Sequence, residues 1–424
     1  MNSIKLISGI FISFLLSSTV QAQRYRITDL GTLPGGESSE ANAINDRGVV
    51  VGDSTEPAGT HAFVWTESDG IKDLGNLPGG GAYSSAYGIN LKGVIVGASD
   101  FSQSQAFQGS THAFVTSPLG LQDLGTLGCP DITGATGINS SSEVVGVSTV
   151  PSCSGGGQYR AFKFSHGNMQ DLGILPGGTF SSGKAINNSG HIVGYADCGS
   201  CLYGDYHAFF WNKEEGMQDI GAFPGDISSE ALGINSSDSI VGAAYYHTGL
   251  TTAEGAFLWE KDAGIKDLGA LPGKSGATAI GINDKNQIVG VSSYGPTDQI
   301  GTHNHAFLWE KERGMQDLND LIQPDPAWEL LSAVAINIRG QIVGFGRHNN
   351  QERAFLLTPV CNSRWRRYED HELADGEHDF DSKRDRHRGA EVEPCGMSTS
   401  PSNDEFHDAV GQDNARDVGS NQEY

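Results

Sequence analysis

The chain has 424 residues and a formal net charge of −24, with 58 glycines and 6 cysteines. This excess of acid argues against nucleic-acid backbones and anionic membranes as partners, because no basic patch is present to replace their counterions. Neutral glycans, cations and basic proteins are compatible with this charge as partners. The glycines lack the three-residue period of collagen, and their abundance is typical of many short strands joined by tight turns.

The N-terminal segment has the pattern of an export signal. Lys5 supplies a positive residue, LISGIFISFLLSSTV an apolar core, and Val20-Gln21-Ala22 a small-residue cleavage site. We therefore expect residues 1–22 to be removed and the mature protein to be secreted, either extracellular or periplasmic. The apolar run is too short for a spanning helix, so no membrane insertion is expected.

One pattern then repeats along the chain. Its first signature, DLGTLPGG or a variant, recurs every 44 to 50 residues, at Asp29, Asp73, Asp123, Asp171, Asp219, Asp267 and Asp317. Each copy is followed by a segment such as SEANAIN, a β-branched run such as VVVG, and an Ala-Phe segment such as HAFVW. These alternating and β-branched segments predict four strands per repeat, with little room for helix.

The connections between the strands are readable as turns. Asn45-Asp46-Arg47-Gly48 predicts a tight turn in which Asn45 bonds to its own backbone two residues on, and the fourth residue takes a positive φ. Pro34 and Gly35 predict a type II turn after the opening strand. A strand and not a helix follows Gly35, which argues against a phosphate-binding loop. We expect the repeated Asp residues to be hydrogen-bonding partners in turns and strand ends.

The size of the repeat indicates the architecture. Four antiparallel strands in about 48 residues match one propeller blade. We predict an all-β fold, a seven-bladed β-propeller over residues 23–360. The last repeat ends at its third strand, whereas the mature chain begins with an orphan fourth strand, RYRITDLG, which is expected to close the ring. An open β-solenoid is the alternative, since it tolerates any repeat number.

The joint pattern DLGxLPGG, AIN, VVG and HAF over residues 24–360 resembles the HAF-repeat family of probable extracellular proteins. The family is named for the sequence His-Ala-Phe, which occurs here at His61-Ala62-Phe63 and at the equivalent segments that begin at His112, His207 and His305. Three copies depart, with Arg160, Gly255 and Arg353 in place of His. The resemblance implies a secreted repeat protein and brings no catalytic residues. We expect the His to be a hydrogen-bonding residue between strands.

Topology divides the loops between two faces. The first-to-second and third-to-fourth turns are short and uniform, whereas the other connections hold the irregular sequence and form what we call the loop-rich face. Binding residues usually lie on variable loops held by a rigid frame. We predict that this face binds an extracellular glycan or protein through eight residues: Tyr203, Tyr206, Tyr245, Tyr246, His247, Tyr294, His303 and Asn304. We expect a monomer without a cofactor.

The sequence gives little support for metal binding or catalysis on this face. His247, His303 and His348 fall in consecutive repeats, but no ligand spacing supports them, so no metal is expected. No GxSxG motif occurs and no pair of carboxylates stands out, so no catalytic residue is assigned. The alternative function is a secreted propeller hydrolase or lyase acting on polysaccharide or peptide.

The cysteines and the C-terminal segment complete the predictions. Export permits disulfides, and Cys198 with Cys201 is expected to be a loop staple because a redox CxxC needs a βαβ context. Cys129 with Cys153 is a second predicted bridge. Residues 361–424 carry 16 acidic and 8 basic residues with almost no aliphatic ones, which predicts a disordered acidic tail.

Overall fold

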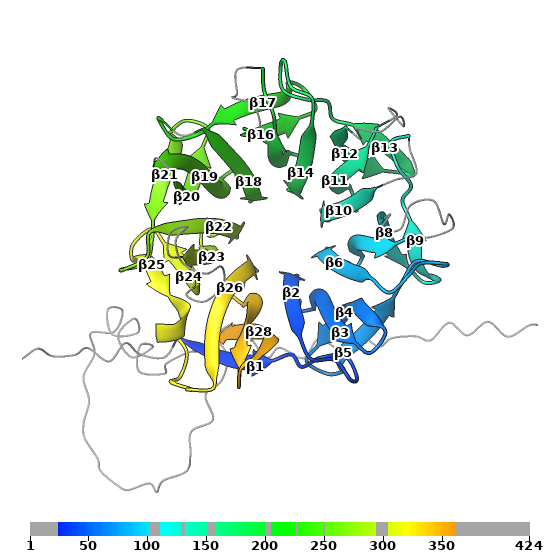
Figure 1. The fold of residues 1–424 in the computed structure, drawn as a ribbon, viewed down its shortest axis with the longest axis vertical. Coiled ribbons are helices and arrows are strands. Elements are labelled where there is room, and N and C mark those ends of the chain that lie inside the picture. The colour runs from blue at the N-terminus through cyan, green and yellow to red at the C-terminus, as the bar shows by residue number, and fades with distance from the viewer. Residues whose placement is uncertain are drawn as a thin grey trace, which may run out of the picture.

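The computed structural model of the protein describes residues 24–101, 111–128, 132–150, 158–199, 205–225, 227–248, 251–293 and 304–360. These residues form seven antiparallel sheets of four strands each, arranged as a ring (Figure 1). The predicted seven-bladed β-propeller is therefore confirmed. Each sheet is a blade whose first strand lies nearest the central axis.

The blades follow chain order, and their strands are as follows. Blade 1 contains β2 (Ser39–Ile44), β3 (Val50–Glu56), β4 (Gly59–Thr66) and β5 (Gly70–Gly75), and blade 2 contains β6 (Ser84–Ile89), β7 (Ile95–Asp100), β8 (Thr111–Ser117) and β9 (Gly120–Asp123). Blade 3 contains β10 (Thr133–Ile138), β11 (Val144–Thr149), β12 (Tyr159–Ser165) and β13 (Asn168–Asp171), and blade 4 contains β14 (Ser181–Ile186), β15 (Ile192–Ala196), β16 (His207–Asn212) and β17 (Gly216–Gly221). Blade 5 contains β18 (Ser228–Ile234), β19 (Ile240–Thr248), β20 (Thr251–Glu260) and β21 (Gly264–Gly269), and blade 6 contains β22 (Gly276–Ile282), β23 (Ile288–Ser293), β24 (His305–Glu310) and β25 (Gly314–Asp317). Blade 7 contains β26 (Trp328–Ile336), β27 (Ile342–His348), β28 (Gln351–Pro359) and the N-terminal strand β1 (Tyr25–Asp29).

The ring closes as predicted. β1 pairs with β28 in antiparallel register from Tyr25 opposite Pro359 to Asp29 opposite Phe355. Tyr25 of β1 is 2% exposed and Leu30, which follows β1 directly, is 3% exposed, so the closing segment also contributes to the core. This closure excludes the open solenoid. Among the described residues the one helical element is the 3-10 turn η1 (Leu318–Asp320), and none of their helices has the length and apolar character to cross a membrane.

The core explains two of the repeat signatures. The Phe of every Ala-Phe segment is completely buried, at Phe63, Phe114, Phe162, Phe209, Phe257, Phe307 and Phe355. The Gly that ends each β-branched run lies against the preceding strand in all seven repeats, and in five of them also against the Phe side chain, at Gly97, Gly146, Gly194, Gly242 and Gly290. A Cβ on Gly242, for example, would come within 1.9 Å of the Glu230 carbonyl oxygen and 2.8 Å of Phe257. The Gly is required because the strands and the Phe approach too closely for any side chain.

The turns also match the sequence predictions. The fourth turn residue has a positive φ in every repeat, at Gly48, Gly93, Ser142, Gly190, Asp238, Asn286 and Gly340. Asn45 accepts the Arg47 backbone N–H through its side chain at 3.0 Å, two residues on as expected. Gly35 has a φ of 79° and follows Pro34, in agreement with the type II turn.

Candidate functional site

The repeated Asp residues are structural, as predicted. In each of the first six blades the Asp carboxylate accepts a backbone N–H two residues on, as Asp73 does from Gly75 at 2.7 Å. In four blades the second carboxylate oxygen contacts the Nδ1 of the HAF histidine, in the pairs His61–Asp73, His112–Asp123, His207–Asp219 and His305–Asp317. The His therefore joins the third strand of a blade to its fourth, which confirms the expectation for His305.

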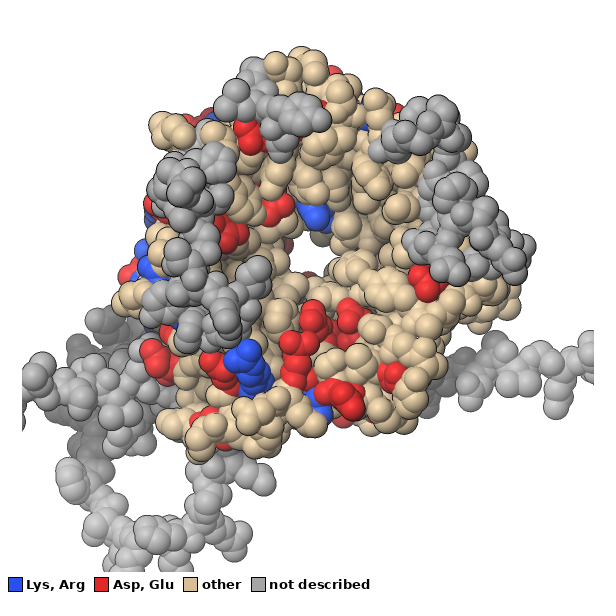
Figure 2. Space-filling view, in the orientation of Figure 1, with Lys and Arg blue, Asp and Glu red and all other residues tan. Residues whose placement is uncertain are grey.

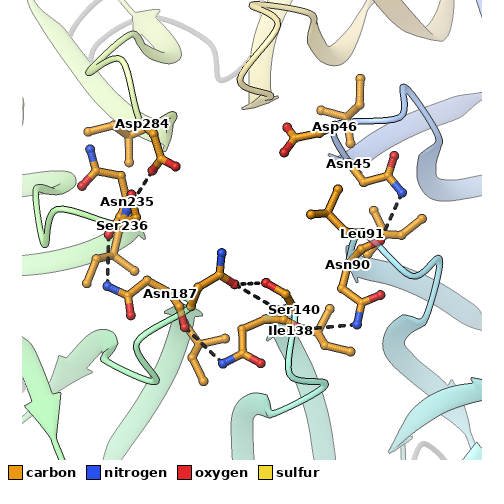
Figure 3. A pocket seen from close by; sticks show the side chains of 17 residues that line it. Asn45, Asp46, Asn90, Leu91, Ile138, Ser140, Asn187, Asn235, Ser236 and Asp284 are labelled. Carbon is orange, nitrogen blue, oxygen red and sulfur yellow. Dashed lines mark hydrogen bonds between the residues drawn. The ribbon is translucent and has the colours of Figure 1, made fainter.

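The repeated Asn residues form a closed ring between the blades, of which Figure 3 shows the part that contains Asn45, Asn90, Asn187 and Asn235. Each Asn Nδ2 donates to the backbone carbonyl of the next Asn at 3.0 to 3.2 Å, in the order Asn45, Asn90, Asn139, Asn187, Asn235, Asn283, Asn337 and back to Asn45. The ring lines a cavity of about 210 Å³ on the face of uniform turns. Its amide groups are used in joining blades, so we assign this cavity to architecture.

The loop-rich face is acidic around the axis. Figure 2 shows Asp and Glu side chains on several sides of the central opening. Glu40 and Glu230 occupy the same position of the innermost strands β2 and β18, and Glu254 and Glu352 occupy equivalent positions near the start of third strands. The acids thus form two groups, one between blades 7 and 1 and one around blade 5.

The first group is a carboxylate cluster made of Glu40, Asp53 and Glu352. Asp53 accepts hydrogen bonds from Asn42 at 3.1 Å and Ser85 at 2.7 Å, and burial raises its pKa. Burial, together with the charges of Asp53 and Glu352 and a hydrogen bond to Glu352, raises the pKa of Glu40 to about 7. A carboxyl group that stays protonated near neutral pH can donate a hydrogen bond or a proton.

The second group lies beside a row of four aromatic rings, which we call the tyrosine row. Phe180, Tyr195 and Tyr206 belong to blade 4 and its approach, and Tyr245 lies on β19 of blade 5. Ring centroids are 5.9 Å apart from Phe180 to Tyr195, 4.9 Å from Tyr195 to Tyr206, and 6.3 Å from Tyr206 to Tyr245. All four side chains are partly exposed. The row therefore presents rings to solvent across two blades.

Acids fix the end of this row. The Tyr245 hydroxyl donates to Glu230 at 2.6 Å, and Glu254 is hydrogen-bonded by Thr278 of blade 6. Burial, followed by the charge of Glu230, raises the pKa of Tyr245, and the same causes raise the pKa of Tyr206 to about 12. Both hydroxyls therefore stay protonated at physiological pH and keep their capacity to donate.

The structure brings together only part of the predicted set. Tyr206 and Tyr245 are neighbours in the tyrosine row. Asn304 precedes β24 in blade 6 and does not belong to the row. Tyr246 and His247 belong to β19, but their side chains lie outside the described part of the structure, as do residues Tyr203, Tyr294 and His303 in full.

The structure tests the histidine and cysteine predictions at the two residues that it describes, His348 and Cys198. His348 pairs through Nδ1 with Asp29 at 2.8 Å and stacks on Trp328, so it belongs to blade closure and is not available for the metal reading weighed above. Cys198 carries no free thiol. Cys201, Cys129 and Cys153 lie outside the described residues, and both pairings stay predictions.

Within the described part of the chain, two residue groups could geometrically hold a metal ion. They are Glu56, His61 and Asp73 in blade 1, and Cys198, His207 and Asp219 in blade 4. Both contain a His–Asp pair of the kind that repeats in other blades, and Cys198 has no thiol to offer. We assign these groups to inter-strand pairing.

Sequence reasoning did not identify the two acidic groups, because a polar residue is expected at every second position of a half-buried strand. One signal was present for Asp53. The position after the Gly of the β-branched run holds Ala98, Val147, Tyr195, Ala243, Val291 and Phe345 in the other repeats, so Asp53 is the one charge at an otherwise uncharged position. The statement that no carboxylate pair stands out was wrong, since Glu40 and Glu352 share a hydrogen bond.

Comparisons with known proteins find distant similarity to solved structures and to nothing else. No protein-family model and no curated protein matches the sequence. Among solved structures, a streptogramin B lyase is 11% identical with a TM-score of 0.45, covering 79% of this chain and 98% of that one. The β-propeller domain of the Trilobed protease from Pyrococcus furiosus is 10% identical with a TM-score of 0.48, covering 80% of this chain and 99% of that one. These likenesses are too distant to carry an argument about function.

Proposed function

We propose that this protein is an exported, non-catalytic binding module, of the HAF-repeat kind, that takes a glycan or protein partner on its loop-rich face. The observation that carries the proposal is the tyrosine row, which spans blades 4 and 5 with its rings partly exposed. Tyrosines offer apolar area with a polar end at low conformational cost, which suits both sugar rings and polypeptide surfaces.

The surrounding charge narrows the partner. Glu40, Asp53 and Glu352 in blades 1 and 7, and Glu230 and Glu254 in blade 5, repel phosphate-rich or sulfate-rich partners. Neutral glycans and basic polypeptides are the classes that fit. Export, the basis for placing the partner outside the cytoplasm, is supported by the N-terminal signal pattern alone.

Replacing Tyr206 and Tyr245 together with Ala should weaken partner binding by about 30-fold or more, since truncating even one central aromatic residue at an interface costs about 2 kcal/mol or more. A glycan array and a pull-down from the native secretome identify the partner, and calorimetry then compares the variants. Tyr159→Ala is the matched control, because Tyr159 precedes the third-strand Arg160 of blade 3 as Tyr206 precedes His207. Unchanged affinity in the double variant, with affinity lost in the control, would place the site elsewhere.

A second candidate function follows from the carboxylate cluster. A protonated Glu40 beside the carboxylates of Asp53 and Glu352 has the composition of a general acid paired with a base, as a hydrolase or lyase requires. This candidate predicts turnover of a polysaccharide or peptide whose rate falls as pH rises through the pKa of Glu40, because a general acid acts only while it is protonated.

The variant Glu40→Gln separates the two candidates. A carboxyl whose folded pKa is raised stabilises the fold fully below its unfolded pKa, and loses that contribution as pH rises through about 7. Gln mimics the protonated acid, so at pH 8 the variant should be more stable by about 1 kcal/mol after allowance for partial exposure, and equal near pH 4. Thermal melts across pH measure this. Binding that persists in the variant supports the module, whereas a partner that is hydrolysed by wild type and not by the variant supports the enzyme.

A further inference from the structure

Blade 5 lacks the basic residue that every other blade places before its Ala-Phe pair. The other six blades have His61, His112, Arg160, His207, His305 and Arg353 at this position. Blade 5 has Gly255, and a cavity of about 460 Å³ lies beside it. Phe223, Glu254, Asp267 and Ser275 are among the residues that line the cavity, which we call the blade 5 slot.

The His blades show what one wall of the slot binds. In blade 4, His207 Nδ1 contacts the carboxylate of Asp219 at 2.8 Å. This contact raises the pKa of His207 and lowers that of Asp219 against the effect of burial. Asp267 is the equivalent residue of blade 5. It accepts the Gly269 backbone N–H at 2.7 Å, and within the described part of the chain no basic side chain pairs with it.

Blades 3 and 7, which have Arg at the Gly255 position, show what a second wall of the slot binds. Arg160 donates through its guanidinium to the carbonyl of Thr179, and Arg353 donates to the carbonyl of Glu37. Thr179 and Glu37 each lie eight residues after the Asp that begins the connection into the next blade, at Asp171 and Asp29. The corresponding residue after Asp267 is Ser275, which lines the slot.

A third wall is aromatic in this slot and not in the others. Phe223 stands where Leu33, Leu77, Leu127, Leu175 and Leu271 stand in equivalent connections. Its ring lies 3.1 Å from the position that a Cβ on residue 255 would take. An aromatic face beside carboxylates favours a flat cation, because stacking and charge attraction act together. Glu254 adds a further carboxyl group to the lining.

We propose that the blade 5 slot binds an arginine or histidine side chain presented by a partner polypeptide. The inference rests on the proposed function in one respect, that the partner docks on the loop-rich face. The slot lies on that face because it is formed by the connection from blade 5 to blade 6 and by residues near the start of β20. Asp267 accepts the charged N–H groups, the Ser275 carbonyl accepts a second donor, and Phe223 stacks on the planar group. In blades 4 and 6 the protein's own histidines contact the equivalent Asp, and in blades 3 and 7 its arginines contact the equivalent backbone carbonyl.

The test titrates the full mature protein with N-acetyl-arginine methylamide and N-acetyl-histidine methylamide, followed by NMR. N-acetyl-citrulline methylamide is the control probe, since citrulline has the shape of arginine without its charge. We expect one site, at least tenfold preference for arginine over citrulline, and chemical shift changes at Glu254, Gly269 and Ser275. Equal binding of arginine and citrulline would overturn the proposal.

Three variants make the assignment specific. Asp267→Asn keeps the turn to Gly269 and should weaken arginine binding at least tenfold, and Gly255→His should abolish it by filling the slot with the chain's own imidazole. His207→Gly should open a slot beside Asp219 in blade 4 that has Leu175 in place of the aromatic wall, and should therefore add a second, weaker site for the arginine probe. Arginine binding that survives both Asp267→Asn and Gly255→His in folded protein contradicts the slot. The Tyr206 and Tyr245 variants should leave the probe bound, so failure of the tyrosine row and failure of the slot are told apart.

Discussion

A chain that lacks residues 24–30 should not form a stable monomer. This deletion removes β1, the fourth strand of blade 7, and with it the five-residue ladder to β28. Tyr25, Ile27 and Leu30 leave two core clusters, and burial of each contributes about 1.5 to 3 kcal/mol. The ion pair of Arg24 with Glu310, at 3.0 Å, is lost as well. The sum is comparable to the whole stability of a typical domain, about 5 to 15 kcal/mol.

The expected result is loss of the cooperative thermal transition and concentration-dependent association through the bare edge of β28, measured by calorimetry and light scattering. Arg26→Ala, at an exposed position of the same strand, should change the unfolding free energy by less than about 0.5 kcal/mol. A circular permutant that keeps β1 but joins it directly to β28 tests the same pairing without removing it. Tyr25 lies opposite Pro359, so a short turn can join the end of β28 to β1 as a hairpin, and the permutant should fold with a midpoint within a few degrees of wild type. A truncated chain that melts like wild type would show that closure by β1 is dispensable.

The fold was predictable because every signal occurs several times. One Asn-Asp-Arg-Gly turn is weak evidence, but seven aligned turns with a positive φ at the same place leave few alternatives. Closure was predictable from a counting argument, since an orphan fourth strand and a missing fourth strand occur at opposite ends of residues 24–360. The role of the repeated Asp followed from the same logic, because seven equivalent acids cannot all be catalytic.

The candidate site was predictable only in part, because it depends on what differs between repeats. The tyrosine row includes Tyr206 and Tyr245, which were visible in irregular loops, but also Phe180 and Tyr195, which a strand pattern conceals. Glu40 and Glu352 are 312 positions apart and meet only because the ring closes. Their hydrogen bond has no local signature. The slot beside Gly255 became meaningful once the neighbouring blades showed what a His or an Arg does at that position.

The Asn ring predicts the second large effect, on stability. Asn45→Ala removes one side-chain donor to the Asn90 carbonyl and one acceptor for the backbone N–H groups of Arg47 and Val49. Asn45 is 5% exposed, so the groups left behind have little access to water. Three hydrogen bonds at about 1 kcal/mol each, with the cost of unsatisfied buried groups, give an expected loss of about 3 to 5 kcal/mol in the free energy of unfolding. Chemical denaturation measures it, and Asn168→Ala, at an exposed strand start, is the control.

Asn45→Asp distinguishes the hydrogen bond of Asn45 to Asn90, which joins two blades, from its hydrogen bonds to Arg47 and Val49 within the turn. Aspartate keeps the acceptor for Arg47 and Val49, but it cannot donate to the Asn90 carbonyl until it is protonated. Its folded pKa should therefore be raised, and by linkage the stability it contributes is present at low pH and lost as pH rises through that pKa. We expect Asn45→Asp to approach wild-type stability near pH 4 and to fall toward Asn45→Ala at pH 8. If the Asp variant instead matches wild type at pH 8, the turn bonds alone hold this position and the closed ring adds little. If it matches Ala at both pH values, the carboxyl group has left the turn, and the two functions of the Asn side chain cannot be separated by charge.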